Sequence, residues 1–243
     1  MNVLVIGDSC EDVFIYGNIT RLAPEAPVPV IVPMRQKSNL GMAGNVYNNL
    51  KSLGVLSDLI TNKDIIRKVR YVDESYNQMV LRVDENDNCS RYDGDVFVQD
   101  KYDALIISDY NKGFLTEEDI AKWSKVANCP VFLDTKKILG PWCTDVDFIK
   151  INNTEYERNL SVIRNDTSLK DKLIITKGKY GCEYKGIVYP TREVSVRDVS
   201  GAGDTFIAGL VCQYIKNNNI LQSIEFAQEC TTEVVQKSGV ATL

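Results

Sequence analysis

Short apolar runs alternate with helical patterns along most of this chain, and this alternation constrains the fold more than any other feature. Residues 43–53 and 116–127 have the pattern of helices. The runs with the length of buried strands are residues 3–6, 104–107, 131–133, 148–151 and 173–176. Strands that alternate with helices indicate an α/β fold, in which a mostly parallel sheet lies between helices. A chain of 243 residues can bury the core of one such domain, so we expect a single domain over residues 1–243.

Polar or glycine residues follow these apolar runs directly. They are Gly7-Asp8, Ser108-Asp109, Asp134, Asn152 and Lys177-Gly178. In open α/β sheets, ligands bind in a crevice at the carboxyl ends of the strands. We therefore expect one crevice to collect these residues.

A glycine-rich loop precedes the clearest helical pattern of the chain, which begins at Phe206. The loop reads Asp198-Val199-Ser200-Gly201-Ala202-Gly203-Asp204-Thr205-Phe206, and residues 194–197 alternate like a short strand that leads into it. Glycines at a helix N-terminus leave backbone N–H groups open to an anion such as a phosphate. Asp204 beside that anion could take a proton from an attacking hydroxyl group. The alternative is that Asp204 only complements the helix dipole.

The loop resembles the second signature of the ribokinase-like (PfkB) family of carbohydrate kinases, which reads D-x-x-G-A-G-D-x-F. The resemblance implies a three-layer sandwich with a mostly parallel central sheet and a small β lid. It also implies an ATP-dependent sugar kinase, with Asp204 as the catalytic base and Gly201, Ala202 and Gly203 in the catalytic loop. The absence of a G-x-x-x-x-G-K-[ST] sequence excludes a Walker A loop as the ATP site.

One branch of this family, the heptose 7-phosphate kinase domain of lipopolysaccharide-precursor synthesis, resembles the chain further. Residues 21–30 read R-L-A-P-E-A-P-V-P-V, where that branch is close to R-I-S-P-E-A-P-V-P-V, and residues 108–113 and 133–136 also match it. The implied reaction converts heptose 7-phosphate to heptose 1,7-bisphosphate. Two alternatives stay open: another kinase of this fold, acting on fructose, ribose or a nucleoside, and a non-catalytic relative that binds a nucleotide or a sugar.

The resemblance also implies binding residues. Those expected to bind the sugar are Asp12, Asn45, Lys68, Arg70, Asp109 and Lys112. Those expected to bind ATP are Asn152, Lys136, Lys177, Gly178, Gly181 and Gly239, with the adenine between the helix that starts near Leu221 and the loop 238–241. Mg²⁺ is expected at Asn152 and Glu155, mostly through water, since Mg²⁺ keeps several waters.

Several of these residues have a simpler interpretation. Asn152 with Glu155 three residues later is also a capping box, and both roles can hold together. Asp12 is also a common turn residue. The turn at Gly178 and Gly181 could be an ordinary glycine turn before the hairpin predicted at 182–184 and 187–189.

Two extended segments, at about 14–32 and 67–83, do not fit the alternation and predict a small separate sheet, although they could instead extend the main sheet. In the resembling family this sheet is a lid over the sugar and often a dimer contact, so we expect a homodimer. Arg67, Lys68, Arg70 and Arg82 lie in these segments, where they could meet a sugar phosphate or simply keep exposed strand edges in solution.

The chain departs from its relatives at two places. Met42 stands where a second glycine is expected, which would reshape the sugar pocket. Residues 59–64 run almost directly into the strand near Arg67, where relatives insert a helix and another strand.

Composition excludes several other classes of protein. With 28 basic and 33 acidic residues and no basic cluster, nucleic acid is not an expected partner. No apolar run approaches the roughly 20 residues of a membrane span, and no signal-peptide pattern is present, so we expect a cytoplasmic protein without a membrane partner. The chain has no histidine, which excludes a Ser-His-Asp hydrolase, and its seven cysteines lack a C-x-x-C pair, which predicts free thiols.

Overall fold

A central sheet of eight strands forms the body of the computed structural model, which describes residues 1–95, 101–237, 239 and 242–243. The order in these ranges is β12-β11-β10-β9-β8-β7-β1-β4, and the strands from β10 to β4 run parallel. Their bounds are β1 Asn2–Gly7, β4 Leu56–Ile60, β7 Ala104–Asp109, β8 Val131–Thr135, β9 Phe148–Asn152 and β10 Leu173–Thr176. Every predicted strand run lies in one of these strands, so the predicted parallel sheet is confirmed.

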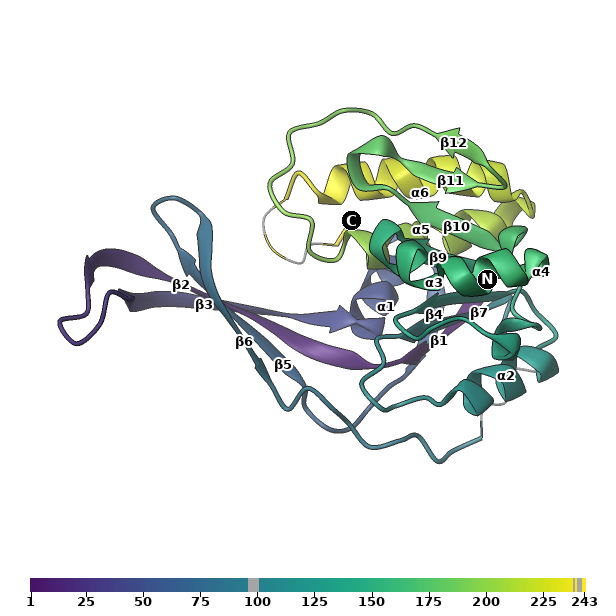
Figure 1. The fold of residues 1–243 in the computed structure, drawn as a ribbon, viewed down its shortest axis with the longest axis horizontal. Helices are drawn as coiled ribbons and strands as arrows, with labels where there is room; N and C mark the ends of the chain where they lie inside the picture. The colour runs from purple at the N-terminus through teal and green to yellow at the C-terminus, as the bar shows by residue number, and fades with distance from the viewer. Residues whose placement is uncertain (96–100, 238, 240–241) are drawn as a thin grey trace.

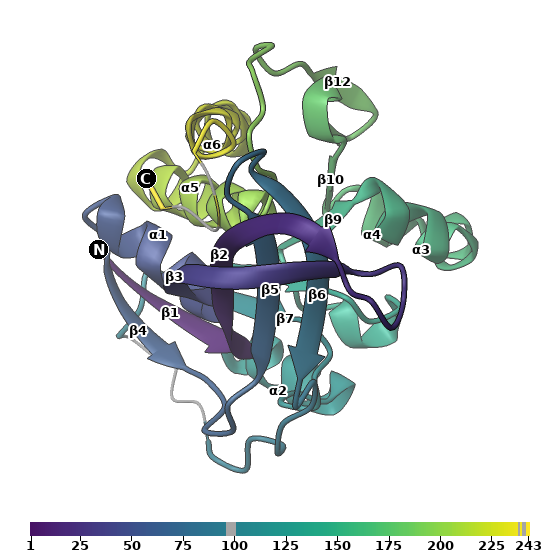
Figure 2. The ribbon, with the colours of Figure 1, turned by 90° about the vertical axis from the view of Figure 1, so that its left-hand side faces the viewer.

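Helices cover both faces of this sheet and make three layers (Figures 1 and 2). Their bounds are α1 Ala43–Ser52, α2 Glu117–Val126, α3 Asn153–Asn165, α4 Thr167–Lys170, α5 Ala202–Asn217 and α6 Ile220–Val234. Alternate residues of β1 point to opposite faces, so Val3 and Val5 pack with α1, α5 and α6, while Leu4 and Ile6 pack with α2, α3 and α4. Burial on both faces explains why the strands read as continuous apolar runs.

After β10, the predicted hairpin is present but the predicted short strand is not. β11 (Cys182–Tyr184) and β12 (Ile187–Tyr189) form the predicted antiparallel hairpin. The short strand predicted at 194–197 is wrong, because this segment is an irregular loop. The N–H groups of Arg197 and Asp198 both donate to the carbonyl oxygen of Val235 at the end of α6, over 2.8 and 3.3 Å, instead of joining a sheet.

A second sheet of four strands projects from the body as a lid (Figure 1). Its order is β3-β2-β5-β6, with bounds β2 Ser9–Leu22, β3 Pro29–Met42, β5 Arg67–Asp73 and β6 Gln78–Glu85. The prediction of a separate sheet is confirmed, and the alternative that these strands extend the main sheet is wrong.

The lid strands differ from the predicted segments 14–32 and 67–83 in their bounds. Residues 23–28 form a turn between β2 and β3, and β3 continues to Met42 at the start of α1. Pro29 opens β3, and Pro33 lies at a shift in the pairing of β3 with β2. Both positions suit proline, because an edge strand tolerates a residue without an N–H group at its first position or at a bulge.

All seven cysteines are free, as predicted. Burial raises the pKa of the Cys10 thiol to about 12, so this residue of β2 stays protonated at neutral pH. Within the described ranges, no helix combines the length and the apolar character needed to cross a membrane.

Candidate active site

Asp204 lies in the first turn of α5 and is 3% exposed. The helix can start there because Gly201 has φ +80°, a left-handed conformation that favours glycine. Asp204 Oδ1 accepts a hydrogen bond from the Tyr110 hydroxyl over 2.6 Å, and Oδ2 accepts one from Asn45 Nδ2 over 3.0 Å. Burial raises the pKa of Asp204 from 3.8 to about 6. A carboxylate with a pKa near neutrality is suited to general-base catalysis.

The start of α5 can accept an anion beside Asp204. Among the described residues, no side chain caps this helix, so its first-turn N–H groups are not taken up by a capping side chain. A Cβ on Gly203 would lie 2.7 Å from Lys150 Nζ, which shows that this ammonium group lies directly against the loop. The loop therefore combines the positive end of a helix with a nearby lysine, as an anion site requires.

Lys150 belongs to a buried network of charges at the carboxyl ends of β8 and β9. Its Nζ atom lies 2.7 Å from Asp134 Oδ2, and the two side chains are 4% and 1% exposed. Lys136 approaches Asp134 Oδ1 at 3.6 Å and pairs closely with Glu155. The sequence interpretation did not include Lys150, although a lysine inside the apolar run 148–151 was the signal that could have identified it.

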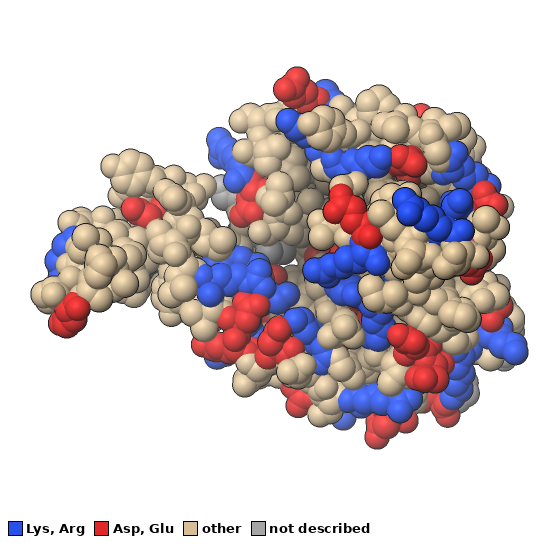
Figure 3. All heavy atoms as spheres, viewed as in Figure 1, with Lys and Arg blue, Asp and Glu red and all other residues tan. Residues whose placement is uncertain are grey.

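Tyr110 is the second site residue that the sequence interpretation did not single out. Besides its hydrogen bond to Asp204, Tyr110 has two lysines at its ring, with Lys68 Nζ 5.3 Å and Lys136 Nζ 5.0 Å from the ring centroid. Lys68 comes from the lid and Lys136 from the end of β8, so Tyr110 lies where the lid meets the body. Lys and Arg side chains also gather on both sides of the hollow between lid and body (Figure 3).

Asp12 and Arg70 form an ion pair on neighbouring lid strands. Arg70 Nη1 donates to Asp12 Oδ1, and their side chains are 11% and 7% exposed respectively. A Cβ on Gly41 would lie 2.0 Å from Asp12 Oδ2, so a larger residue at this position of β3 would force the Asp12 carboxylate to move. The structure thus gives Arg70 a partner inside the protein, while its predicted contact with the sugar stays a prediction.

Lys68 differs from the three arginines of β5 and β6, each of which has an ion-pair partner. Arg67 pairs with Glu11 and Arg82 with Asp84, whereas the described residues offer Lys68 no carboxylate at ion-pair distance. Its Nζ atom lies 3.3 Å from Met42 Sδ, and Lys68 is 8% exposed. Burying an ammonium group without a counter-ion costs free energy, so Lys68 is a candidate to bind an anionic ligand.

Met42 stands where the resembling family has a second glycine. It immediately precedes α1 with φ +62° and ψ −131°, a conformation that glycine adopts more easily, and it is 3% exposed. The Met42 side chain fills space beside Cys10, Ile66 and Lys68.

Asp109 and Lys112, both predicted to bind the sugar, make contacts inside the body. Asp109 is fully buried and accepts hydrogen bonds from Thr135 Oγ1 and Lys137 Nζ over 2.6 and 2.8 Å. Lys112 Nζ lies 2.5 Å from Asp87 Oδ2. The structure does not bring either side chain into hydrogen-bond contact with Asp204, and their sugar contacts stay a prediction.

A cavity of about 290 Å³ opens beside the glycine loop. Its walls come from α5, the end of α6, the turn after β10 and the loop 191–199, and include Gly178, Gly181, Ala202, Gly203, Phe206 and Val235. The volume is close to the lower limit of roughly 300 Å³ for ligand pockets. The predicted residues Gly178 and Gly181 therefore meet the catalytic loop in one cavity.

Other residues predicted to bind ATP have different surroundings. Lys177 Nζ pairs with Glu183 Oε2 over 2.5 Å. The helix predicted to start near Leu221 is α6, and Gln228, Thr231 and Thr232 of this helix line the cavity, while the adenine contact itself stays a prediction. Ser238, Val240 and Ala241 of the predicted loop lie outside the described residues.

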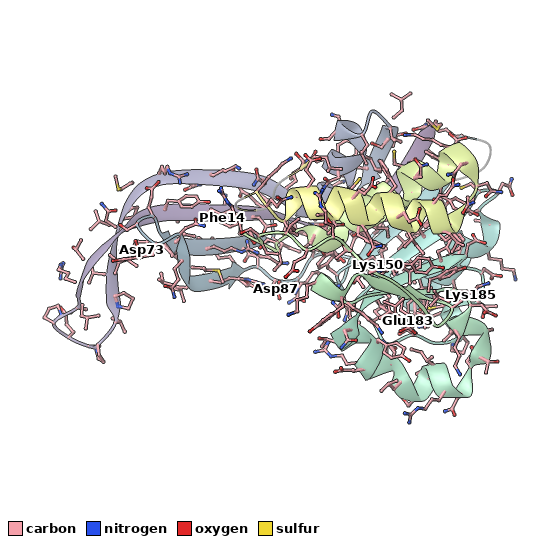
Figure 4. All side chains as sticks on the ribbon, turned by 90° about the horizontal axis from the view of Figure 1, so that it is seen from above. Phe14, Asp73, Asp87, Lys150, Glu183 and Lys185 are labelled. Atoms are coloured by element: carbon pink, nitrogen blue, oxygen red, sulfur yellow. The ribbon has the colours of Figure 1, made fainter. Side chains whose placement is uncertain are left out.

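Gly239 lies where the end of the chain meets the lid. A Cβ there would come within 3.8 Å of the Phe14 ring, and its N–H donates to Asp198 Oδ2 over 3.0 Å. Figure 4 shows Phe14 on the lid beside the end of α6, and Lys150 inside the body. Gly239 thus links the lid to the segment that precedes the catalytic loop, and its nucleotide contact stays a prediction.

Asn152 and Glu155 form the capping box of α3. Asn152 Oδ1 accepts from the Glu155 N–H over 2.9 Å, and Glu155 Oε2 accepts from the Asn152 N–H over 2.8 Å. The capping interpretation is confirmed, while the Mg²⁺ role stays a prediction. In the part of the chain that the structure describes, no group of three His, Cys, Asp or Glu residues could hold a metal.

Comparison with known proteins gives three findings. Residues 116–243 match the family described as pfkB family carbohydrate kinase. The Bifunctional protein HldE of a Nitratiruptor species is 29% identical over 291 residues, covering 99% of this chain and 62% of that protein. The HldE protein of Helicobacter pylori (strain Shi470) is 31% identical over 294 residues, covering 98% of this chain and 64% of that protein.

The chain thus spans about three fifths of the length of these curated relatives. The alignments are longer than the chain, so the matched parts of the relatives contain residues that this chain lacks. Among solved structures, the ribokinase of Arabidopsis thaliana complexed with ribose and ATP superposes with a TM-score of 0.67 at 14% identity, covering 98% of this chain and 93% of that one. The fold is therefore that of ribokinase.

Proposed function

This chain belongs to the pfkB family of carbohydrate kinases, and from this premise we propose that it transfers the γ-phosphoryl group of ATP to a hydroxyl group of a sugar phosphate. Asp204 takes the proton of the attacking hydroxyl, since its raised pKa and its place beside the glycine loop suit that role. The N–H groups of Gly203 and Asp204 stabilise the charge on the transferred group, and Gly201 permits the turn at the start of α5. The N–H of Ala202 donates to the Val199 carbonyl oxygen over 3.2 Å, so it can join them only if that bond opens. Positioning and electrostatics carry such a reaction.

The cavity beside the loop is the place where we propose that ATP binds, and the Arabidopsis ribokinase of the same fold was solved as a complex with ATP. Lys136 and Lys150 lie at the phosphate end, next to Gly203 and Glu155. Mg²⁺ fits the oxygen donors of Asn152 and Glu155 through water, because both side chains already make their capping bonds. When bound, the metal neutralises phosphate charge.

The observation that best supports a sugar phosphate as the acceptor is the environment of Lys68. Lys68 is 8% exposed, has no carboxylate partner among the described residues, and its Nζ atom lies 5.3 Å from the centroid of the Tyr110 ring, whose hydroxyl donates to Asp204. An acceptor with its hydroxyl at Asp204 could place a distal phosphate at this ammonium group and so supply the missing counter-ion. We propose that Asp12, which stands opposite Lys68 in the pairing of β2 with β5, and Asn45, which donates to Asp204, bind sugar hydroxyls.

Heptose 7-phosphate is the acceptor that we propose, with heptose 1,7-bisphosphate as the product. Its support is the resemblance of residues 21–30 to heptose 7-phosphate kinases, together with the HldE relatives. Met42 permits a second candidate, a kinase for fructose, ribose or a nucleoside, because it stands where the resembling family has a glycine close to the sugar.

A coupled assay of ADP release separates these candidates. We expect a higher kcat/KM for heptose 7-phosphate than for unphosphorylated heptose, and we expect Lys68→Met to raise the KM for heptose 7-phosphate about tenfold or more without changing the KM for ATP. Lys125→Met, on the exposed face of α2, is the matched control. Equal use of both heptoses by the unchanged protein would contradict the phosphate site and favour the second candidate.

We further propose that the lid pairs with a second copy, which makes a homodimer, and that the enzyme works in the cytoplasm, where ATP is available. All eight residues of β6 are exposed, among them Met79, Leu81 and Val83, and an edge strand with apolar side chains needs cover. Light scattering should give twice the mass of the chain at micromolar concentration. A fully active monomer would contradict this.

A further inference from the structure

Gln228 of α6 has a buried side chain with an unused hydrogen-bonding atom. It is 8% exposed, it lines the cavity beside the glycine loop, and its Oε1 atom has no partner among the described residues. An unpaired buried amide oxygen is unfavourable, and native proteins rarely keep one without a reason. A ligand in the cavity is a candidate for its partner.

The cavity around Gln228 has a largely apolar wall, and it is also lined by Lys179, Arg192 and Glu193. Val194, Val196 and Val199 come from the loop over the cavity, and Phe206 and Val235 come from α5 and the residue after α6. The hydroxyls of Thr231 and Thr232 donate to carbonyl oxygens of their own helix over 2.8 and 2.7 Å. The Gln228 amide, in contrast, can still hydrogen-bond to the edge of a nucleotide base.

Gly181 makes the room that this amide occupies. A Cβ on Gly181 would lie 2.7 Å from Gln228 Oε1, 2.0 Å from the Tyr189 carbonyl oxygen and 2.9 Å from the Thr191 nitrogen. Gln228 Oε1, the Tyr189 carbonyl oxygen and the Thr191 nitrogen thus all border the space beside Gly181, and no described group hydrogen-bonds Gln228 Oε1. Either the oxygen or the nitrogen of the amide can take this position, because the two ends of a glutamine amide are nearly equal in shape.

We propose that Gln228 binds the 6-substituent of a purine and, by turning its amide, accepts both the 6-amino group of ATP and the 6-oxo group of GTP. The amide oxygen accepts from the amino group of adenine, and the amide nitrogen donates to the oxygen of guanine. This inference rests on the proposed nucleotide site and adds the residue that sets the choice of base.

Calorimetry tests this without any sugar, with ATP, GTP and purine riboside triphosphate, which lacks a 6-substituent, each in excess Mg²⁺. We expect ATP and GTP to bind within about tenfold of each other, and the unsubstituted nucleotide to bind about tenfold more weakly than ATP. Gln228→Met, which keeps the length of the side chain, should bring all three affinities within about threefold. Gln222→Met, at an exposed position of the same helix, is the matched control and should leave the preferences unchanged.

The outcomes distinguish this inference from the proposed function. Equal binding of all three nucleotides to the unchanged protein, or a preference that survives in Gln228→Met, would overturn the role of Gln228. If ATP bound but GTP bound more than a hundredfold more weakly, the proposal that the Gln228 amide turns to accept either base would be wrong. Failure of every nucleotide to bind would contradict the ATP site itself.

Discussion

Replacing Asp204 with asparagine should abolish turnover and stabilise the fold at the same time. Burial raises the pKa of Asp204 by about 2 units, from 3.8 to about 6, and each unit corresponds to about 1.36 kcal/mol. Because the folded-state pKa lies above that of the unfolded chain, the stability tied to this group is fully present below pH 3.8 and is lost as the pH rises through about 6. At pH 8 the buried charge therefore costs up to about 3 kcal/mol.

Asparagine keeps the shape of this side chain without its charge. Its oxygen can accept from Asn45, and its nitrogen can donate to the Tyr110 hydroxyl, which is also an acceptor. We expect Asp204→Asn to lower kcat by about 10² to 10⁴ and to raise the free energy of unfolding at pH 8 by as much as about 3 kcal/mol, with a smaller gain at pH 5.

Urea unfolding at pH 5 and pH 8 measures this effect, and calorimetry with ATP checks that the nucleotide site survives. Asp166→Asn is a control of opposite sign, because hydrogen bonds from the Ser168 hydroxyl and N–H hold the pKa of Asp166 below its usual value. A variant at Asp204 that is less stable than the unchanged protein at pH 8, or whose gain is equal at both pH values, would refute the reasoning. A near-normal kcat would show that Asp204 is not the base.

Three further substitutions test the surroundings of the base. Tyr110→Phe removes a hydrogen bond that lowers the pKa of Asp204, so the acid limb of the kcat/KM profile should move up by roughly one unit from about pH 6, and an unmoved limb would contradict this. Lys150→Met leaves Asp134 buried beside only the more distant Lys136, so the free energy of unfolding should fall by about 3 kcal/mol in urea; a loss under about 1 kcal/mol would contradict the pairing. Met42→Gly should raise kcat/KM for unphosphorylated sugars roughly tenfold, which a sugar panel would disprove if the preference stayed the same.

Much of the fold follows from local patterns in the sequence. The apolar runs and the helical spacing place β1, β7 to β10, α1 and α2, because each run is buried on both faces and each helix on one. The lid was predicted as a separate sheet, but the length of β3 was not, since residues 33–42 are mostly exposed and carry no apolar alternation.

The site was less predictable, because its contacts join residues far apart in the chain. Tyr110 and Asp204 are separated by 94 positions, and no local pattern states that their side chains meet. The partners of Arg70 and Lys112 depend on strand register and loop path in the same way. Lys150 is the exception, since a charge inside an apolar run requires a buried partner.

The most direct test of the central claim, that this is a sugar-phosphate kinase with Asp204 as its base, is to identify the product by ³¹P NMR after incubation with ATP, Mg²⁺ and heptose 7-phosphate. The account predicts a second phosphate on the sugar, one ADP for each bisphosphate formed, and no product from Asp204→Asn in the same time. Phosphate transfer to unphosphorylated sugars alone, or the same yield from Asp204→Asn, would contradict it.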